Sequence, residues 1–90
     1  MNQTRMISFV IPVLNEQDSL GVLHEAVTAS LAPLSLAYEM IFVDDGSTDG
    51  SLSVLQDLYH ADPAHVRVIQ FRRNFGKTAA LSAGFARVRG

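Results

Sequence analysis

Three short apolar runs, rich in β-branched residues, alternate along the chain with three stretches in which apolar residues recur every three or four positions. The runs cover residues 6–13, 38–43 and 66–71, and nearly continuous apolar runs of this length are typical of strands buried in a parallel sheet. The intervening stretches predict amphipathic helices. The order strand-helix-strand-helix-strand-helix therefore predicts an α/β fold, a Rossmann-like sheet whose parallel strands are joined by right-handed crossovers.

Each predicted helix has an apolar face and a stop signal. The first ends before Pro33 and the second before Pro63, because proline cannot continue a helix, and Gly90 closes the third. Thr48 or Asp49 is expected to cap the second helix. The residues expected on the buried faces are Leu20, Val22, Leu23, Ala26, Val27 and Leu31 in the first helix, Leu52, Leu55, Leu58 and Tyr59 in the second, and Ala80, Leu81, Gly84, Phe85 and Val88 in the third.

The composition is that of one small globular domain. Of the 90 residues, 48% are hydrophobic and 18% are charged, and the net charge of -2 provides no general attraction to nucleic acid or to an anionic membrane. The absence of cysteine excludes disulfides and thiolate metal sites. Because no stretch has the length of a membrane span or the form of a signal peptide, we expect the chain to be cytoplasmic.

The strand count predicts an open sheet edge. In a doubly wound sheet of order 3-2-1-4, a fourth strand lies beside the first, and no fourth strand follows the third helix in residues 1–90. The strand at residues 6–13 would then be free on one side, and a long apolar edge could pair with a second copy of the chain. We therefore expect a fragment of a larger α/β protein.

Polar side chains gather where the three predicted strands end. In open α/β sheets, ligands bind in the crevice outside the carboxyl ends of the strands. Two of the strand ends, or tips, carry acids and an amide, and the third carries cations. This combination suits a nucleotide, because the acids and the amide can accept from its hydroxyl or imide groups and the cations can bind its phosphates. Gly76 and the start of the third helix offer backbone N–H groups to a phosphate. The tips carry Pro12, Leu14, Asn15 and Glu16; Asp44 and Asp45; and Arg72, Arg73, Asn74 and Lys77.

Structural roles are open for several of these side chains. Asp44 and Asp45 could form a capped turn, and Asn15 could cap the first helix. Glu16 could simply be an acidic side chain stabilised by the positive, N-terminal end of that helix's dipole. The arginines of the third tip could be solvated. The three histidines, His24, His60 and His65, follow no metal or triad spacing and are expected at the surface.

Other nucleotide-binding and signalling readings fit less well. The chain has neither a Walker lysine loop nor a Gly-x-Gly-x-x-Gly motif, which disfavours ordinary ATP and NAD sites. In a signalling receiver, an acidic pair follows the first strand and a phosphoacceptor aspartate follows the third. Here the acidic pair follows the second strand, and the third ends in Gln70-Phe71-Arg72 without an acid.

Three motifs, in order and at the expected spacing, resemble the N-terminal half of the family 2 inverting glycosyltransferases. They are VIPVLNE at residues 10–16, VDDGSTD at 43–49, and RNFGK at 73–77 followed by Ala80-Leu81 and Gly84. The likeness is greatest to the dolichol-phosphate mannose synthase and polyprenyl-phosphate glycosyltransferase branch. It implies a GT-A-type fold, of which residues 1–90 are the donor-nucleotide-binding half.

The resemblance also implies roles for individual residues. Pro12, Leu14, Asn15 and Glu16 would contact the nucleoside of a sugar nucleotide. Asp44 and Asp45 would lie at the base and ribose, with Asp45 as the direct contact to the base. Lys77 would lie near the base and phosphates, assisted by Arg73.

The resemblance implies a reaction as well. The parent would transfer a sugar from a UDP- or GDP-sugar to a dolichyl or undecaprenyl phosphate at the cytoplasmic membrane face, and the alternative acceptor is a polysaccharide or another saccharide. The family's Asp-x-Asp motif, which holds Mg²⁺ or Mn²⁺ against the diphosphate, lies after the next strand and is absent here. Residues 1–90 should therefore contain no catalytic residue and no metal ligand. Alone, the chain is expected to bind nucleotide without turnover, as a non-catalytic nucleotide-binding or interaction fragment.

Overall fold

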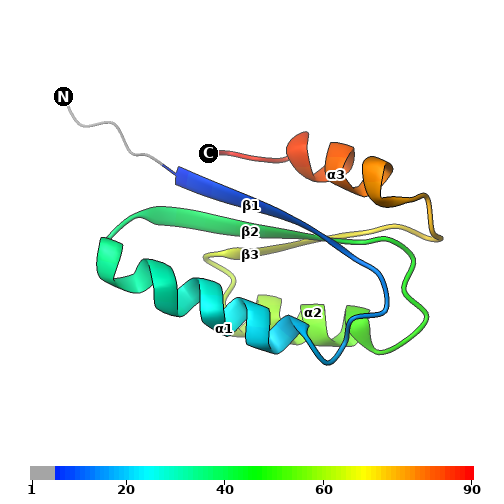
Figure 1. The fold of residues 1–90 in the computed structure, drawn as a ribbon, viewed down its shortest axis with the longest axis horizontal. Helices are drawn as coiled ribbons and strands as arrows, with labels where there is room; N and C mark the ends of the chain where they lie inside the picture. Colours follow the sequence, from blue (N-terminus) through cyan, green and yellow to red (C-terminus); the bar gives the residue numbers. More distant parts are fainter. Residues whose placement is uncertain (1–5) are drawn as a thin grey trace.

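The computed structural model describes residues 6–90, and its elements follow the predicted order (Figure 1). Three parallel strands alternate with helices, which confirms the α/β fold class. A short 3-10 helix, η1, connects the first helix to the second strand. The bounds are β1 (Met6–Val13), α1 (Leu20–Leu31), η1 (Ala32–Leu34), β2 (Ala37–Asp44), α2 (Ser51–Ala61), β3 (Val66–Gln70) and α3 (Lys77–Phe85).

The sheet has the order β1-β2-β3, so β2 lies at its centre. Helices α1 and α2 cover one face, and α3 covers the other (Figure 1). The register aligns Val13 with Asp44 and Asp44 with Gln70. All three strands therefore end at one edge of the sheet, and the predicted polar tips are brought together there.

In the described part of the chain, β1 pairs on one side only, as the sequence predicted. The carbonyl of Val13 accepts the N–H of Asp45. Because backbone groups of successive strand residues point in opposite directions, the neighbouring Pro12 faces away from β2. Its missing N–H therefore costs no ladder bond.

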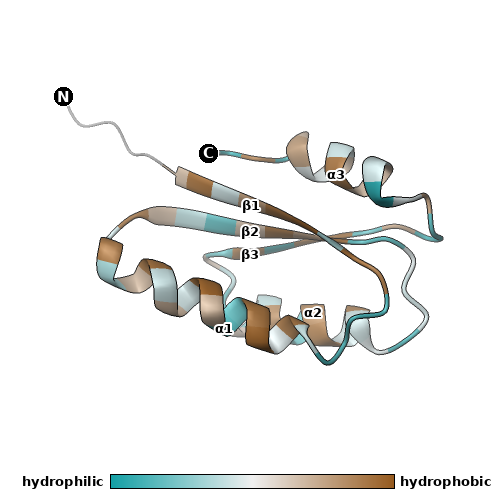
Figure 2. Cartoon of the chain, in the orientation of Figure 1, coloured by the Kyte–Doolittle hydropathy of each residue, from teal (hydrophilic) through white to brown (hydrophobic). Residues whose placement is uncertain are grey.

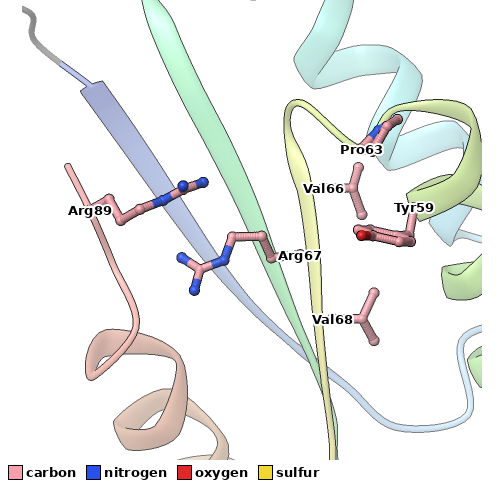
Figure 3. Close-up of a pocket in the computed structure, with 6 residues that line it drawn as sticks. All are labelled: Tyr59, Pro63, Val66, Arg67, Val68 and Arg89. Atoms are coloured by element: carbon pink, nitrogen blue, oxygen red, sulfur yellow. The ribbon is translucent and has the colours of Figure 1, made fainter.

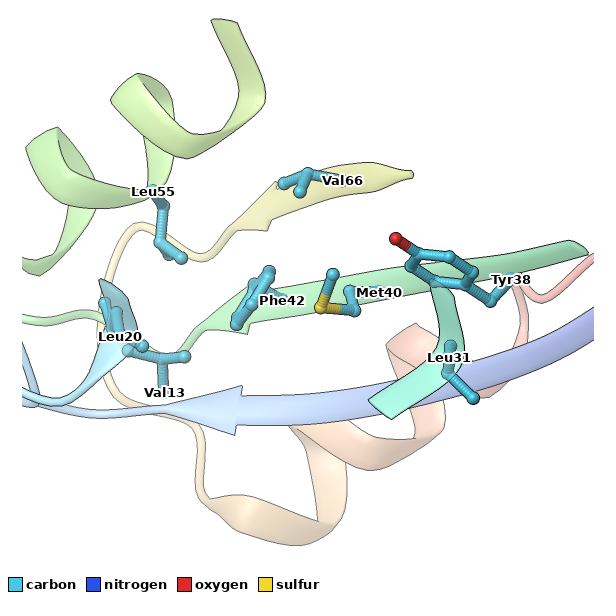
Figure 4. Close-up of a cluster of buried hydrophobic side chains, with 8 residues drawn as sticks. All are labelled: Val13, Leu20, Leu31, Tyr38, Met40, Phe42, Leu55 and Val66. Carbon is cyan, nitrogen blue, oxygen red and sulfur yellow. The ribbon is translucent and has the colours of Figure 1, made fainter. Parts of the chain in front are cut away.

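The main hydrophobic core lies between the sheet and helices α1 and α2 (Figure 4). A smaller cluster of Ile41, Val43 and Ala80 lies under α3. Gly84 lets α3 approach closely, since a Cβ there would lie 2.2 Å from a methyl carbon of Val10. In Figure 2 the brown of hydrophobic residues marks much of β1 and parts of the helices. The main core comprises Val13, Leu20, Leu31, Tyr38, Met40, Phe42, Leu55 and Val66.

The predicted buried face of α1 is partly wrong. Val22 is 69% exposed, and Leu23 and Ala26 are also exposed. The helix presents a narrower stripe to the core, in which His24 lies between Leu20 and Val27. The stripe is narrow because α1 covers β1 at the sheet edge, where no further strand contacts its outer side in the described residues.

Two aromatic residues predicted to be buried are exposed, Tyr59 in α2 and Phe85 in α3. Helix α3 also ends at Phe85, earlier than predicted, so Val88 and Gly90 lie beyond it. Val88 still packs against the smaller cluster. The residues after the helix run back along the sheet, where the N–H groups of Arg89 and Gly90 donate to Glu39 and Ser8.

Glu39 holds that returning segment. This carboxylate in β2 is fully buried and accepts hydrogen bonds from the Ser8 hydroxyl, from Arg67 and from both the backbone and the side chain of Arg89. Burial alone would raise the pKa of Glu39, but these hydrogen bonds outweigh it and lower the pKa to about 2. The N–H of Gly90 donates to Ser8 and completes the attachment.

A polar cluster joins α1 to the end of α2. The carboxylate of Asp62 contacts His24 Nε2 at 2.9 Å and His65 Nδ1 at 2.8 Å, and the His65 ring stacks on Tyr38. Burial would raise the pKa of Asp62, and the hydrogen bonds and charges of the two histidines lower it. The prediction that these two histidines are plain surface residues was therefore wrong, whereas His60 is exposed.

Candidate functional site

A cleft of about 320 Å³ opens where the three strand tips meet. Of the eight residues to which the family resemblance assigned a role, five line the cleft, and Asn15, Asp44 and Arg73 do not. The cleft contains acidic and basic side chains side by side with apolar ones, as small-molecule sites commonly do. Its lining is Pro12, Val13, Leu14, Glu16, Asp45, Asn74, Gly76 and Lys77.

Asn15 joins the first tip to the second. Its Oδ1 accepts the N–H groups of Thr48 at 2.8 Å and Asp49 at 3.2 Å, while its own N–H donates to Ser47. Its backbone has φ of +53°, a left-handed conformation that asparagine adopts more readily than most residues. In this structure Asn15 therefore shapes the site by holding the neighbouring turn.

The turn after β2 is closed by its own carboxylates. Asp44, which is buried, accepts the N–H of Ser47. Gly50 occupies the cap position of α2, so neither Thr48 nor Asp49 is the cap residue. Asp49 lies one residue earlier, where it accepts the N–H of Ser51 at 2.8 Å. The hydrogen bond from the Ser51 hydroxyl is the main cause that lowers the pKa of Asp49.

Asp45 connects the second tip to the third. It is only 3% exposed, and its two oxygens accept the N–H groups of Phe75 at 2.7 Å and Gly76 at 3.0 Å. These bonds hold the loop that leads into α3. Because a carboxylate has about four acceptor positions, Asp45 keeps acceptor capacity toward the cleft that it lines.

Gly46 and Arg73 pack backbone against backbone. Gly46 has φ of +77°, and a Cβ there would lie 2.3 Å from the carbonyl carbon of Arg73. The Arg73 guanidinium lies over the Phe75 ring, 4.7 Å from its centroid. Arg73 thus stiffens the loop beside the cleft without lining it.

Glu16 and Lys77 are the cleft's exposed charges. Among residues 6–90, neither side chain has a hydrogen-bond or ion-pair partner within bonding distance. Glu16 is anchored by its backbone N–H, which donates to the Ser51 hydroxyl. Lys77 is the first residue of α3. An anionic and a cationic side chain are therefore available to a ligand.

The sequence model of one protein family matches residues 8–90, and that family is described as glycosyl transferase family 2. The match covers nearly the whole chain. The chain belongs to glycosyl transferase family 2.

Curated relatives of this family 2 chain are named undecaprenyl-phosphate 4-deoxy-4-formamido-L-arabinose transferase. The protein from Pseudomonas fluorescens (strain SBW25) is 45% identical over 84 residues, covering 93% of this chain and 25% of its own length. Proteins from Klebsiella pneumoniae and Yersinia pestis (strain Pestoides F) are 42% and 43% identical over 86 residues, covering 96% of this chain and 26% of theirs. The chain thus spans about a quarter of the length of these relatives.

The acidic pair of this family 2 chain is engaged in hydrogen bonds to the backbone. Asp44 and Asp45 both accept backbone N–H groups, and residues 6–90 contain no group of three His, Asp or Glu side chains placed to hold a metal ion. Within the same residues, no helix is both long and apolar enough to cross a membrane.

Three residues that line the cleft had no role implied by the family resemblance: Val13, Asn74 and Gly76. Asn74 was predicted at the third strand tip and Gly76 as a backbone donor to phosphate, so only Val13 was missed altogether. In the sequence, nothing distinguishes Val13 from the other apolar residues of its strand. Asn74 and Gly76 belong to the RNFGK motif, and the left-handed backbone of Gly76, with φ of +100°, is the kind of position that a glycine in a polar loop signals.

Proposed function

We propose that this chain is the donor-nucleotide-binding part of a glycosyltransferase that takes a sugar from a UDP- or GDP-sugar. The observation that carries the proposal is the cleft at the strand tips, where Glu16, Asp45 and Lys77 surround one space. A nucleotide presents base N–H groups, ribose hydroxyls and phosphates, and these side chains supply acceptors for the first two and a cation for the third.

Each side chain takes the role that its position allows. The remaining acceptor capacity of Asp45 would receive a base N–H, and Glu16 would accept from ribose hydroxyls. Lys77, at the start of α3, would lie against the phosphates, where the helix dipole also favours negative charge. Pro12 and Leu14 would provide apolar contacts to the nucleoside.

Asn15, Asp44 and Arg73 would contribute indirectly. Asn15 and Asp44 hold the turn between the first two tips, and Arg73 packs on the third loop. Their effect on nucleotide affinity would come from keeping the direct contacts in place.

The acceptor that we propose is a polyprenyl phosphate, because the relatives named above are undecaprenyl-phosphate transferases. The parent protein would then act at the cytoplasmic face of the membrane.

The metal ion would be bound by residues outside this chain. Mg²⁺ or Mn²⁺ would there neutralise charge on the departing diphosphate. The chain alone would bind nucleotide without turnover, and it would not bind nucleic acid.

Calorimetric titration of the folded chain with UDP and with GDP tests the proposal. We expect weak, saturable binding of at least one of the two nucleotides. The nucleotide with the higher affinity identifies the donor class, UDP-sugar or GDP-sugar. Absence of heat with both at millimolar ligand, from a sample with the far-ultraviolet dichroism of an α/β fold, would contradict it.

We also propose that the free edge of β1 supports self-association. The strand has eight residues, and none is charged, so no charged side chain on β1 opposes pairing with another strand. Sedimentation velocity should show a larger species as the concentration rises from micromolar to millimolar. A single monomeric boundary throughout that range would refute this.

A further inference from the structure

The outer edge of β3, on the opposite side of the sheet from β1, forms a second open groove of about 460 Å³. Figure 3 shows that its lining straddles the strand. Apolar and aromatic side chains lie on the α2 side of β3, and two arginines lie on the other. The groove is lined by Tyr59, Pro63, Val66, Arg67, Val68 and Arg89.

The edge of β3 carries unpaired backbone groups. The carbonyl of His65 and the N–H of Phe71 both bond to β2. Because the direction alternates along a strand, Val68 and Gln70 point their N–H and C=O groups away from β2. Among the described residues no strand pairs with them. They form a row of donors and acceptors spaced for another strand.

The two arginines leave the groove with an excess of positive charge. Arg67 and Arg89 share a single carboxylate, the buried Glu39. The side chain of Arg89 is 58% exposed and uses only its Nε on Glu39. The remaining guanidinium donors of Arg89 are therefore available to an acid.

We propose that the β3 edge binds an extended peptide segment of a partner protein, in which acidic and apolar side chains alternate. Such a segment adds to the sheet as a further strand, and its main chain pairs with Val68 and Gln70. Alternate side chains of an added strand point to opposite faces. The apolar ones meet Tyr59 and Val68, and the acidic ones meet Arg67 and Arg89.

Charge complementarity favours this occupant over a second copy of the chain. Two copies paired edge to edge through β3 would place their Arg67 and Arg89 side chains near one another, and like charges at such positions are destabilising. A small anion would contact only the arginine side of the groove and leave the backbone row and apolar side unused.

Nuclear magnetic resonance titration of the isotope-labelled chain tests the proposal with a synthetic peptide of alternating glutamate and valine. We expect the amide signals of Val68 and Gln70 to shift, while those of Phe75 and Gly76 at the nucleotide cleft stay in place. A peptide of the same composition with its glutamates and valines in two blocks should bind weakly, and a lysine-valine peptide should not bind. N-methylation of the alternating peptide should abolish binding, a control that leaves the protein unchanged.

Two matched variants locate the acidic contact. Arg89→Gln should weaken binding by about three- to five-fold, as expected for loss of an exposed ion pair. Arg87→Gln should leave the affinity unchanged, because Arg87 does not line the groove. Equal binding of the block peptide, shifts at the nucleotide cleft in place of β3, or peptide-independent dimers whose contact maps to Val68 would each overturn the proposal.

Discussion

Asp45 and Phe75, thirty residues apart, are joined by a hydrogen bond of 2.7 Å from the Phe75 N–H to Oδ1 of Asp45. The other oxygen of the same carboxylate accepts the N–H of Gly76. Asp45 therefore has two tasks, to line the cleft and to hold the loop that forms its opposite wall. A family motif residue expected to meet the nucleotide base is also part of the framework.

Replacing Asp45 by asparagine should weaken nucleotide binding. The amide has one acceptor oxygen in place of two and loses the charge, so at least one loop N–H or the ligand contact is lost. Because hydrogen bonds to charged groups contribute about 1.5–3 kcal/mol, affinity for UDP or GDP should fall about ten-fold or more, measured by calorimetry.

Asp49→Asn is the matched control, because Asp49 also accepts backbone N–H groups but does not line the cleft. It should lower stability with a smaller effect on affinity. If the two variants lose affinity equally, Asp45 does not contact the nucleotide directly.

Gly46→Ala should be strongly destabilising. The added Cβ would lie 2.3 Å from the backbone of Arg73, at a φ of +77° that alanine rarely adopts. We expect a loss of about 2 kcal/mol or more in urea unfolding, because neither backbone can move away without breaking the turn. Gly21→Ala in α1, where a Cβ meets nothing within 4 Å, should instead stabilise the protein by about 0.5–1 kcal/mol. Equal effects would show that the contact between the two tips is not rigid.

Glu39→Gln should destabilise the fold and make its free energy of unfolding less dependent on pH in the acidic range. The pKa of Glu39 is lowered from 4.5 to about 2, so its contribution is complete above pH 4.5 and is lost as the pH falls from 4.5 toward 2. A shift of this size corresponds to about 3 kcal/mol. The stability difference between wild type and variant, from urea unfolding, should therefore be large at neutral pH and shrink on acidification.

Glu25→Gln is the control for that comparison, since Glu25 is exposed on α1 and should show little difference from wild type at any pH. A Glu39→Gln difference that stays constant down to pH 2 would contradict the assignment.

His24→Ala should lower stability because it removes the contact between α1 and Asp62 at the end of α2. A partly buried hydrogen bond of this kind contributes about 1 kcal/mol, and thermal unfolding would register the loss. His60→Ala removes an exposed ring whose contact stays within α2, so its midpoint should stay close to that of the wild type. Equal midpoints for the two variants would show that the Asp62 cluster contributes nothing.

The order of elements and the place of the site could be predicted because both depend on local pattern. Apolar runs such as residues 38–43 predict strands, and parallel strands align their carboxyl ends, so Glu16, Asp45 and Lys77 had to converge. The buried partners of α1 could not be predicted in the same way. Val22 is the more hydrophobic residue but is exposed, and His24 is polar but is partly buried. Burial does not follow hydropathy here because the position of the sheet edge decides which stripe of the helix is covered.

The amino-acid sequence by itself determined the α/β fold, the family and most of the residues that line the cleft, because periodicity and motif spacing are local properties of the chain. Only the tertiary structure decided what those residues touch. Asp45 bonds to Phe75, Asn15 to Thr48 and Glu39 to Arg89. Each pair joins segments far apart in the chain, and it forms only when the packed sheet brings an acceptor to within hydrogen-bond distance of a donor.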